Sequence, residues 1–283
     1  MQSKSRSLRR DTKAASPAVS MVIITAATVV LVLVSSGYAL QVLWRQQATA
    51  EFDAVQNSLS SFDDALRDIA WDRGGSRSVR FTTNYGNMRL IDSSKEFTIS
   101  AIGLNDTFSY EFTTSAVKYQ MPYGYGYNAG ISGNESPYIL GDEKTVVSRL
   151  TDSFGQALVE QNSDFTSITL NYRVRVSEEG PIKTLEPSKT TVNYVDIFVI
   201  SLKCVSSEIG AGDFDLVCKN IGLDTKSYGV YSIAAATGAH ISVSDGTEPV
   251  GTEPDSINLA DLSLNYGDNV VLNLIVADVR VST

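Results

Sequence analysis

The residue types that most often perform catalysis are scarce in this chain of 283 residues. His240 is the only histidine, which leaves no side chains for a Ser–His triad or a histidine-rich metal site. No nucleophile elbow, P-loop or dinucleotide fingerprint occurs. Two carboxylates alone can hydrolyse a glycosidic bond, but nothing in the sequence singles out such a pair. We therefore expect no enzyme, no metal site and no cofactor.

The two cysteines are candidates for redox chemistry. Cys204 ends a run in which every second residue from Phe198 is apolar, and Cys218 ends a similar run from Phe214. Gly210-Ala211-Gly212 lies midway, so an antiparallel hairpin turning there would place one cysteine opposite the other. We expect a disulfide that forms outside the cell and stabilises the fold by about 3 kcal/mol. Two unlinked thiols in the core are the alternative.

Two further patterns are typical of an exposed surface. Asn105 and Asn134 each begin an Asn-x-Ser/Thr triplet, and both are candidate glycosylation sites. Tyr123, Tyr125 and Tyr127 alternate with glycines, as in adaptable contact surfaces. These tyrosines predict either a patch for subunit packing or adhesion, or a surface loop whose rings fold back on a sheet.

The N-terminal segment determines on which side of a membrane the candidate residues above would lie. Ser3–Lys13 carries five basic residues and one acid, and Ala14–Trp44 contains no charged residue. Because Lys and Arg stay on the cytoplasmic side of a membrane, everything after Arg45 is expected outside the cell. The segment 17–44 is the expected membrane-spanning helix. The apolar surface of this helix includes Val19, Ile23, Val30 and Leu33.

Three kinds of processing are compatible with this segment. The first is a membrane anchor that is never cut. The second is a secretory signal cut at the small residues Gly37-Tyr38-Ala39. The third is a cut on the cytoplasmic side, between Ala14 and Ala15, directly after the basic Lys13.

Past the membrane segment, an apolar stripe predicts an amphipathic continuation of the same helix over 45–73. The stripe consists of Phe52, Val55, Leu59, Phe62, Leu66 and Ile69. Its members follow spacings of three and four. No Pro or Gly interrupts Gln41–Arg73, and Gly74-Gly75 supplies a stop. One helix is therefore expected from about Pro17 to Asp72, and its stripe would hold a folded head. An ordinary membrane-anchored ectodomain could begin in the same way.

Lys13-Ala14 followed by Ala15-Ser16-Pro17 resembles the prepilin-peptidase site of archaeal type IV pilins and archaellins. In that family a basic and a small residue precede the cut, and a Ser-Pro often follows it. The resemblance implies a class III signal peptide, with a leader 1–14 and a mature helix 15–73 that passes from lipid into a filament core. Val19, Ile23, Val30 and Leu33 are the residues expected to pack in that core. Val19 stands where bacterial pilins carry an acidic residue, so the likeness is to the archaeal proteins.

The resemblance also implies partners and a location. The partners are a prepilin peptidase, an assembly ATPase with its membrane platform, and copies of the chain itself or other pilins. The chain would cross the cell membrane once, with its C-terminus outside, and enter an extracellular filament after assembly. We therefore expect a structural subunit, a major or minor pilin, with a role in assembly and adhesion. The alternative is a monomeric membrane-anchored protein that binds a solute or a glycan.

Net charge excludes one class of partner. The chain carries a formal net charge of −9, and removing the basic leader makes the remainder more acidic. Nucleic acid is not an expected partner, because phosphate binding needs clustered Lys and Arg.

The rest of the chain predicts an all-β, sandwich-like head, which gives an α+β class with the long helix. Ser78–Phe81 and Met88–Ile91 predict a hairpin. The alternation from Ile168 to Val176 predicts one strand. Only Glu143–Gln161 has the apolar spacing of a further helix.

Asp215–Gly222 resembles the strand and turn of immunoglobulin-like domains in archaeal surface proteins. The match is short. It implies that 194–283 forms a C-terminal sandwich-like part after a β-rich part over 74–193.

Overall fold

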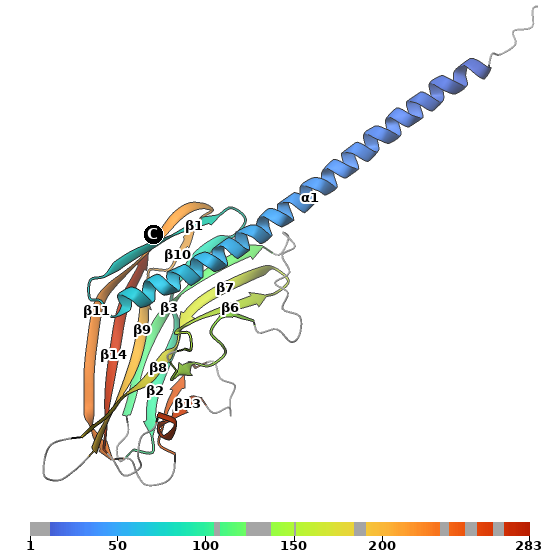
Figure 1. The fold of residues 1–283 in the computed structure, drawn as a ribbon. Coiled ribbons are helices and arrows are strands. Elements are labelled where there is room, and N and C mark those ends of the chain that lie inside the picture. Colours follow the sequence, from blue (N-terminus) through green and yellow to red (C-terminus); the bar gives the residue numbers. More distant parts are fainter. Residues whose placement is uncertain are drawn as a thin grey trace, which may run out of the picture. The chain divides into compact units, whose positions relative to one another are not determined.

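The computed structural model describes residues 12–104, 108–122, 137–149, 151–183, 191–232, 238–246, 254–262 and 269–283, without the side chains of 12–18 and 179–191. One long helix is followed by two curled β-sheets, which confirms the expected α+β class (Figure 1). Met1–Ala48 and Thr49–Thr283 form two compact units, and each is described by itself.

The helix α1 runs from Thr12 to Ala70 as a single element. The helix is long and apolar enough to cross a membrane. The chain turns away after Ala70, where Gly74 adopts a φ of +88° that favours glycine.

Sheet A has the strand order β1-β11-β14-β9-β8-β5. Its strands are β1 (Ser76–Thr83), β5 (Val146–Val147), β8 (Val174–Lys183), β9 (Thr191–Lys203), β11 (Gly212–Ser232) and β14 (Asn269–Ser282). Strands β9 and β14 are parallel, and β11 is antiparallel to β14.

Sheet B has the order β13-β12-β2-β3-β7-β6-β4, and β10 also pairs with β2. Its strands are β2 (Asn87–Ile102), β3 (Phe108–Pro122), β4 (Tyr138–Leu140), β6 (Gly155–Gln161), β7 (Phe165–Tyr172), β10 (Ser207–Ile209), β12 (His240–Ser244) and β13 (Asp255–Asn258). A short 3₁₀ helix, η2 (Leu259–Leu262), follows β13. Strands from 74–193 and from 194–283, which the sequence suggested as separate parts, occur in both sheets.

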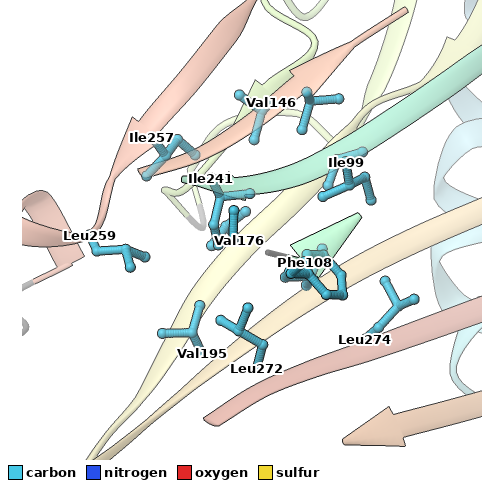
Figure 2. Packing of buried hydrophobic residues seen from close by; sticks show 14 of the residues in the cluster. Ile99, Phe108, Val146, Val176, Val195, Ile241, Ile257, Leu259, Leu272 and Leu274 are labelled. Carbon is cyan, nitrogen blue, oxygen red and sulfur yellow. The ribbon is translucent and has the colours of Figure 1, made fainter. Parts of the chain in front are cut away.

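A hydrophobic core lies between the two sheets (Figure 2). Sheet A contributes Val195 of β9 and Leu272 of β14, and sheet B contributes Ile99 and Phe108. On the opposite face of β9, Ile200 is also buried. Sheet A is therefore covered on both faces at β9, which explains why the residues at 197–200 of this strand are all apolar.

The expected hairpin of Ser78–Phe81 with Met88–Ile91 is wrong. Strand β1 pairs with β11 in sheet A, whereas β2 pairs with β3 in sheet B. The turn between β1 and β2 carries the chain from one sheet to the other. A local pattern predicts two strands but does not say whether they pair.

Two further local predictions are wrong around Arg173. The alternating run from Ile168 to Val176 is broken there into β7 of sheet B and β8 of sheet A. The described part of Glu143–Gln161 contains β5, β6 and turns instead of a helix. Backbone hydrogen bonds from Arg173 N to Phe154 O (3.1 Å) and from Val174 N to Thr145 O (3.0 Å) hold this segment extended.

Candidate functional site

The apolar stripe of α1 is buried within the head, as its spacing predicts. The six residues are exposed by 0–3 %: Phe52, Val55, Leu59, Phe62, Leu66 and Ile69. Phe62 packs edge-on against Phe81 of β1, with ring centroids 6.4 Å apart. Phe52 packs in the same way against Tyr119 of β3, at 6.1 Å. The docked half of α1 therefore contacts both sheets.

A buried carboxylate strengthens this docking at one end. Glu51 is 8 % exposed and accepts hydrogen bonds from the backbone N–H groups of Asn84 (2.7 Å) and Gly86 (3.0 Å). The N–H of Tyr85 lies between its two oxygens, at 3.0 and 3.1 Å. The Tyr119 hydroxyl donates a further bond of 2.7 Å. Glu51 thus binds the whole turn between β1 and β2 to the helix, and we call these contacts the Glu51 clamp.

The clamp leaves no room for a side chain at Gly86. A Cβ atom there would lie 2.4 Å from Cζ of Tyr119. Burial of Tyr119, together with its hydrogen bond to Glu51, raises the pKa of the phenol far above its usual value. The hydroxyl therefore stays protonated and remains a donor.

The C-terminal end of α1 is held by a second polar contact. The Asn220 side chain of β11 donates to the carbonyl oxygens of Ile69 (3.1 Å) and Ala70 (2.7 Å). The last carbonyls of a helix have no partner within the helix, so these bonds satisfy groups that would otherwise be buried without one.

One acidic residue of the docked half is buried without a comparable set of donors. Asp63 is 2 % exposed, and its Oδ1 lies where a Cβ atom on Gly155 would come within 2.3 Å. Burial raises the pKa of Asp63 to about 6, and the nearby Tyr172 hydroxyl and Arg67 only partly offset this. Asp63 is therefore a proton-binding group near neutral pH.

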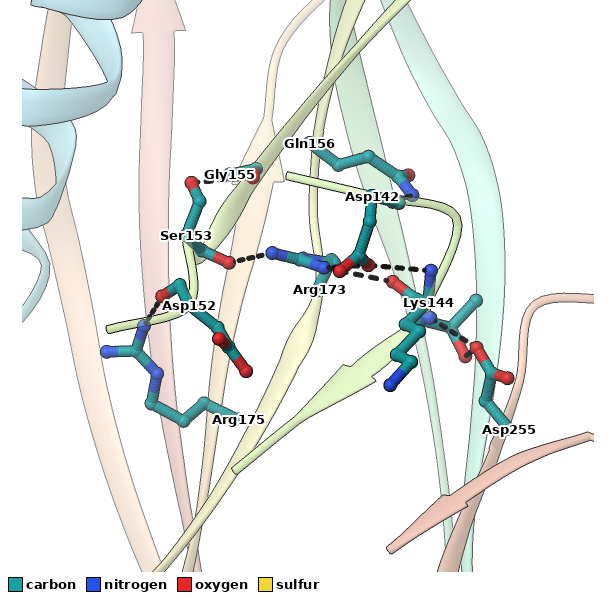
Figure 3. Close-up of polar contacts among 10 residues, drawn as sticks. Asp142, Lys144, Asp152, Ser153, Gly155, Gln156, Arg173, Arg175 and Asp255 are labelled. Atoms are coloured by element: carbon teal, nitrogen blue, oxygen red, sulfur yellow. Dashed lines mark hydrogen bonds and ion pairs between the residues drawn. The ribbon is translucent and has the colours of Figure 1, made fainter. Parts of the chain in front are cut away.

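Arg173 organises the turns that precede β6 (Figure 3). Its guanidinium, on a side chain 2 % exposed, lies 2.6 Å from Asp142 Oδ1 and also donates to the Ser153 carbonyl. Gln156 donates to the Asp142 carbonyl at 2.6 Å, and Arg175 donates to the Asp152 carbonyl at 2.7 Å. The cluster fixes loop geometry and is not arranged around a reactive group.

The remaining predicted residues fall into three groups. Lys13, Ala14 and Ala15 lie within α1. The four residues expected in a filament core are all exposed: Val19 (55 %), Ile23 (61 %), Val30 (58 %) and Leu33 (66 %). The candidate glycosylation sites and contact patch lie outside the described residues: Asn105, Asn134, Tyr123, Tyr125 and Tyr127.

The predicted disulfide is wrong, because Cys204 and Cys218 are both free. Strand β14 lies between β9 and β11, and Cys218 faces Val281 of β14. Neighbouring strands are about 4.8 Å apart, so positions two strands apart are separated by about 10 Å. A disulfide needs Cα atoms within about 7 Å. Among the described residues, no group of three or more His, Cys, Asp or Glu could hold a metal ion.

The sequence reasoning missed Glu51, Asp63 and Arg173. The helical pattern does contain a signal for Asp63, which directly follows Phe62 and lies beside the stripe. Nothing in the pattern marks Glu51 or Arg173, because their partners are backbone groups and side chains, such as Tyr119 and Asp142, from distant parts of the chain.

Comparison with protein-family models, with curated proteins and with solved structures finds no match to this chain. The architecture itself is a long apolar N-terminal helix followed by a β-rich domain. That architecture is consistent with a pilin-like protein, and no family is assigned.

Proposed function

We propose that the chain is a structural subunit of an archaeal type IV pilus-like surface filament, a major or minor pilin. A prepilin peptidase would cut between Ala14 and Ala15, and the helix would then pass from the membrane into a filament core. The observation that carries the proposal is a single helix with two surfaces. From Val19 to Trp44 the helix is uncharged and almost entirely exposed, and its second half is docked on a β head.

The exposed half of α1 needs surroundings that keep its apolar surface away from water. Burying a large aliphatic side chain is worth about 1.5–3 kcal/mol, and α1 exposes such side chains on all sides from Val19 to Leu43. Before assembly, lipid covers this apolar surface and keeps it away from water. In a filament, neighbouring copies of the helix cover it instead. The same helix therefore serves two environments, and an assembly ATPase with its membrane platform would drive the transfer between them.

The Glu51 clamp and the stripe support the proposal from the other end of the helix. A subunit drawn out of the membrane by its head must keep the head attached to the helix. Six buried apolar side chains and a carboxylate that accepts four donors make that attachment firm.

N-terminal sequencing of the protein taken from the cell surface tests the cut, and electron microscopy of sheared surface material tests assembly. The proposal predicts a chain that starts at Ala15 and lies in filaments. A chain that starts at Leu40 would be a secreted protein. An intact leader on a monomeric chain in the membrane would identify an anchored binding protein, and either result contradicts the proposal.

A further inference from the structure

Strands β3 and β11 each have a stretch of free edge in the described part of the chain. Strand β3 pairs with β2 from Phe108 onward, but with β7 only from Val117. Strand β11 pairs with β14 as far as Ser232, but with β1 only up to Lys219. On that side, the first half of β3 and the second half of β11 have no neighbouring strand in the ladder, although Ser201 and Lys203 of β9 donate hydrogen bonds to the Thr113 carbonyl of β3.

These two edges lie side by side. The rings of Phe108 and Tyr228 are 4.7 Å apart in an edge-to-face contact, and Lys226 Nζ lies 5.9 Å from the ring centroid of Tyr110. Between the edges is a groove of about 380 Å³. This volume is at the lower end of the range of about 300–1,000 Å³ that ligand pockets occupy.

Two aromatic rings, together with Val276 of β14, supply the apolar surface of the groove. Tyr110 and Phe112 point to the same side of β3 and are both half-buried, with ring centroids 6.2 Å apart and planes inclined by 23°. Phe112 stacks in turn on Phe97, at 5.2 Å. The rings are therefore held in place before a ligand arrives. The electron-rich face of an aromatic ring attracts weakly positive C–H groups.

Charged side chains border the rings. Asp224 and Lys226 come from β11, Asp278 from β14 and Glu111 from β3. None of these four takes part in an ion pair with another described residue. Each free carboxylate can accept several hydrogen bonds, and the ammonium group can donate three. The groove thus has an apolar floor and a ring of unused hydrogen-bonding groups.

The charged residues that line the groove favour one class of ligand. The lining contains four carboxylates and two lysines, so an anion would be repelled. A purely apolar ligand would leave the carboxylates desolvated without partners. A sugar ring combines one face of C–H groups with a rim of hydroxyls, which matches both features.

We propose that the groove between the free edges of β3 and β11 binds a neutral oligosaccharide. One sugar ring lies against Tyr110 and Phe112. Its hydroxyl groups donate to Asp224 and Asp278 and accept from Lys226. The site belongs to the head alone and does not depend on filament assembly.

The test uses the full chain, purified in a zwitterionic detergent that has no sugar headgroup. The probes are maltotetraose, cellotetraose, mannotetraose and chitotetraose, with tetragalacturonic acid and tetralysine as charged comparisons. Isothermal titration calorimetry should detect at least one neutral tetrasaccharide with a Kd of about 1 mM or tighter. Tyr110→Ala and Asp278→Asn should each weaken that binding by about 10-fold or more.

Two variants keep the result interpretable. Asp224→Asn alters an exposed side chain and should also weaken binding, even if Tyr110→Ala impairs folding. Phe165→Ala removes a half-buried ring of β7 that does not line the groove, and should leave the Kd unchanged. The proposal is overturned if no neutral probe binds, if only a charged probe binds, or if Asp224→Asn and Asp278→Asn bind like the parent chain.

Discussion

The Tyr119 hydroxyl donates a hydrogen bond of 2.7 Å to the Glu51 carboxylate and so joins β3 to α1. The two residues are 68 positions apart in the chain. Around this bond, the turn between β1 and β2 adds three backbone donors to the same carboxylate. The docked helix is therefore locked to both sheets at one point.

Glu51→Gln should destabilise the head. The amide keeps the shape but presents an NH₂ group where the backbone N–H groups and Tyr119 need acceptors. Hydrogen bonds to a charged group are worth about 1.5–3 kcal/mol, so the thermal midpoint should fall by about 5 °C or more. Circular dichroism of the full chain in micelles measures the midpoint. Asp53→Asn, at an exposed position of the same helix, should change it little.

The coupling energy between Glu51 and Tyr119 can be measured with Tyr119→Phe, which removes only the hydroxyl. If the bond carries the interaction, the Glu51→Gln, Tyr119→Phe double variant should lose less stability than the two single losses together. Strict additivity would show that the hydroxyl contributes nothing to the clamp.

Gly86→Ala should be among the most damaging single-methyl additions in the head. The new Cβ would lie 2.4 Å from Tyr119 Cζ, so the ring or the turn must move. We expect a loss of about 2–3 kcal/mol in the free energy of unfolding. Gly210→Ala is the matched control, because a Cβ there meets no atom within 4 Å. Equal midpoints for the two variants would argue against a close contact between Gly86 and the Tyr119 ring.

Asp63 should make the head more stable at mildly acidic than at neutral pH. Burial raises the pKa of the folded state from 3.8 to about 6, so between these values the folded chain holds a proton that the unfolded chain has released. The free energy of unfolding therefore falls as pH rises through this window, by about 3 kcal/mol at most. Asp63→Asn should remove this slope and stabilise the head at pH 7.5.

Thermal midpoints at pH 4.5 and pH 7.5 measure the effect of Asp63→Asn. Asp64→Asn, whose side chain is 79 % exposed, should retain the slope of the parent chain. A parent chain whose midpoint does not change between the two pH values would show that Asp63 ionises normally.

Arg173→Met should loosen the turns before β6. Without the guanidinium, the Ser153 carbonyl loses its donor and Asp142 loses its ion pair. A partly buried acceptor such as the Ser153 carbonyl costs about 1–3 kcal/mol when it is left without a partner, whereas Asp142, whose side chain is 55 % exposed, can be hydrated instead. Limited proteolysis should cut within 142–156 sooner than in the parent chain. Arg149→Met, at an exposed arginine of the same segment, should leave the cleavage rate unchanged.

Features that depend on a single helix or strand could be predicted from the sequence pattern. Phe52, Leu59 and Leu66 share a face because a helix turns every 3.6 residues, and no distant partner is needed to see this. Strand β9 is visible for a similar reason, since its residues at 197–200 are all apolar, as expected where both faces of a strand are covered.

Features that depend on several elements could not be read from local patterns. The local pattern places Cys204 and Cys218 opposite each other because it does not include β14, which separates their strands and lies more than 50 residues further along the chain. Val146 and Phe154 have helical spacing, but the polar contacts of Arg173 with the same segment favour an extended backbone. The groove between β3 and β11 likewise arises only when the two sheets are brought together.

Val30→Asp should prevent the exposed half of α1 both from entering the membrane and from packing in a filament core. Val30 is 58 % exposed in the isolated chain and lies within the uncharged segment Ala14–Trp44. A carboxylate near the centre of a membrane helix costs about 2.5–3.5 kcal/mol, and an unpaired charge in a filament core is also unfavourable. The variant should be depleted from the membrane fraction and absent from sheared filaments. Val30→Ala, which stays apolar, should retain both, whereas normal filaments from Val30→Asp would exclude this segment from the core.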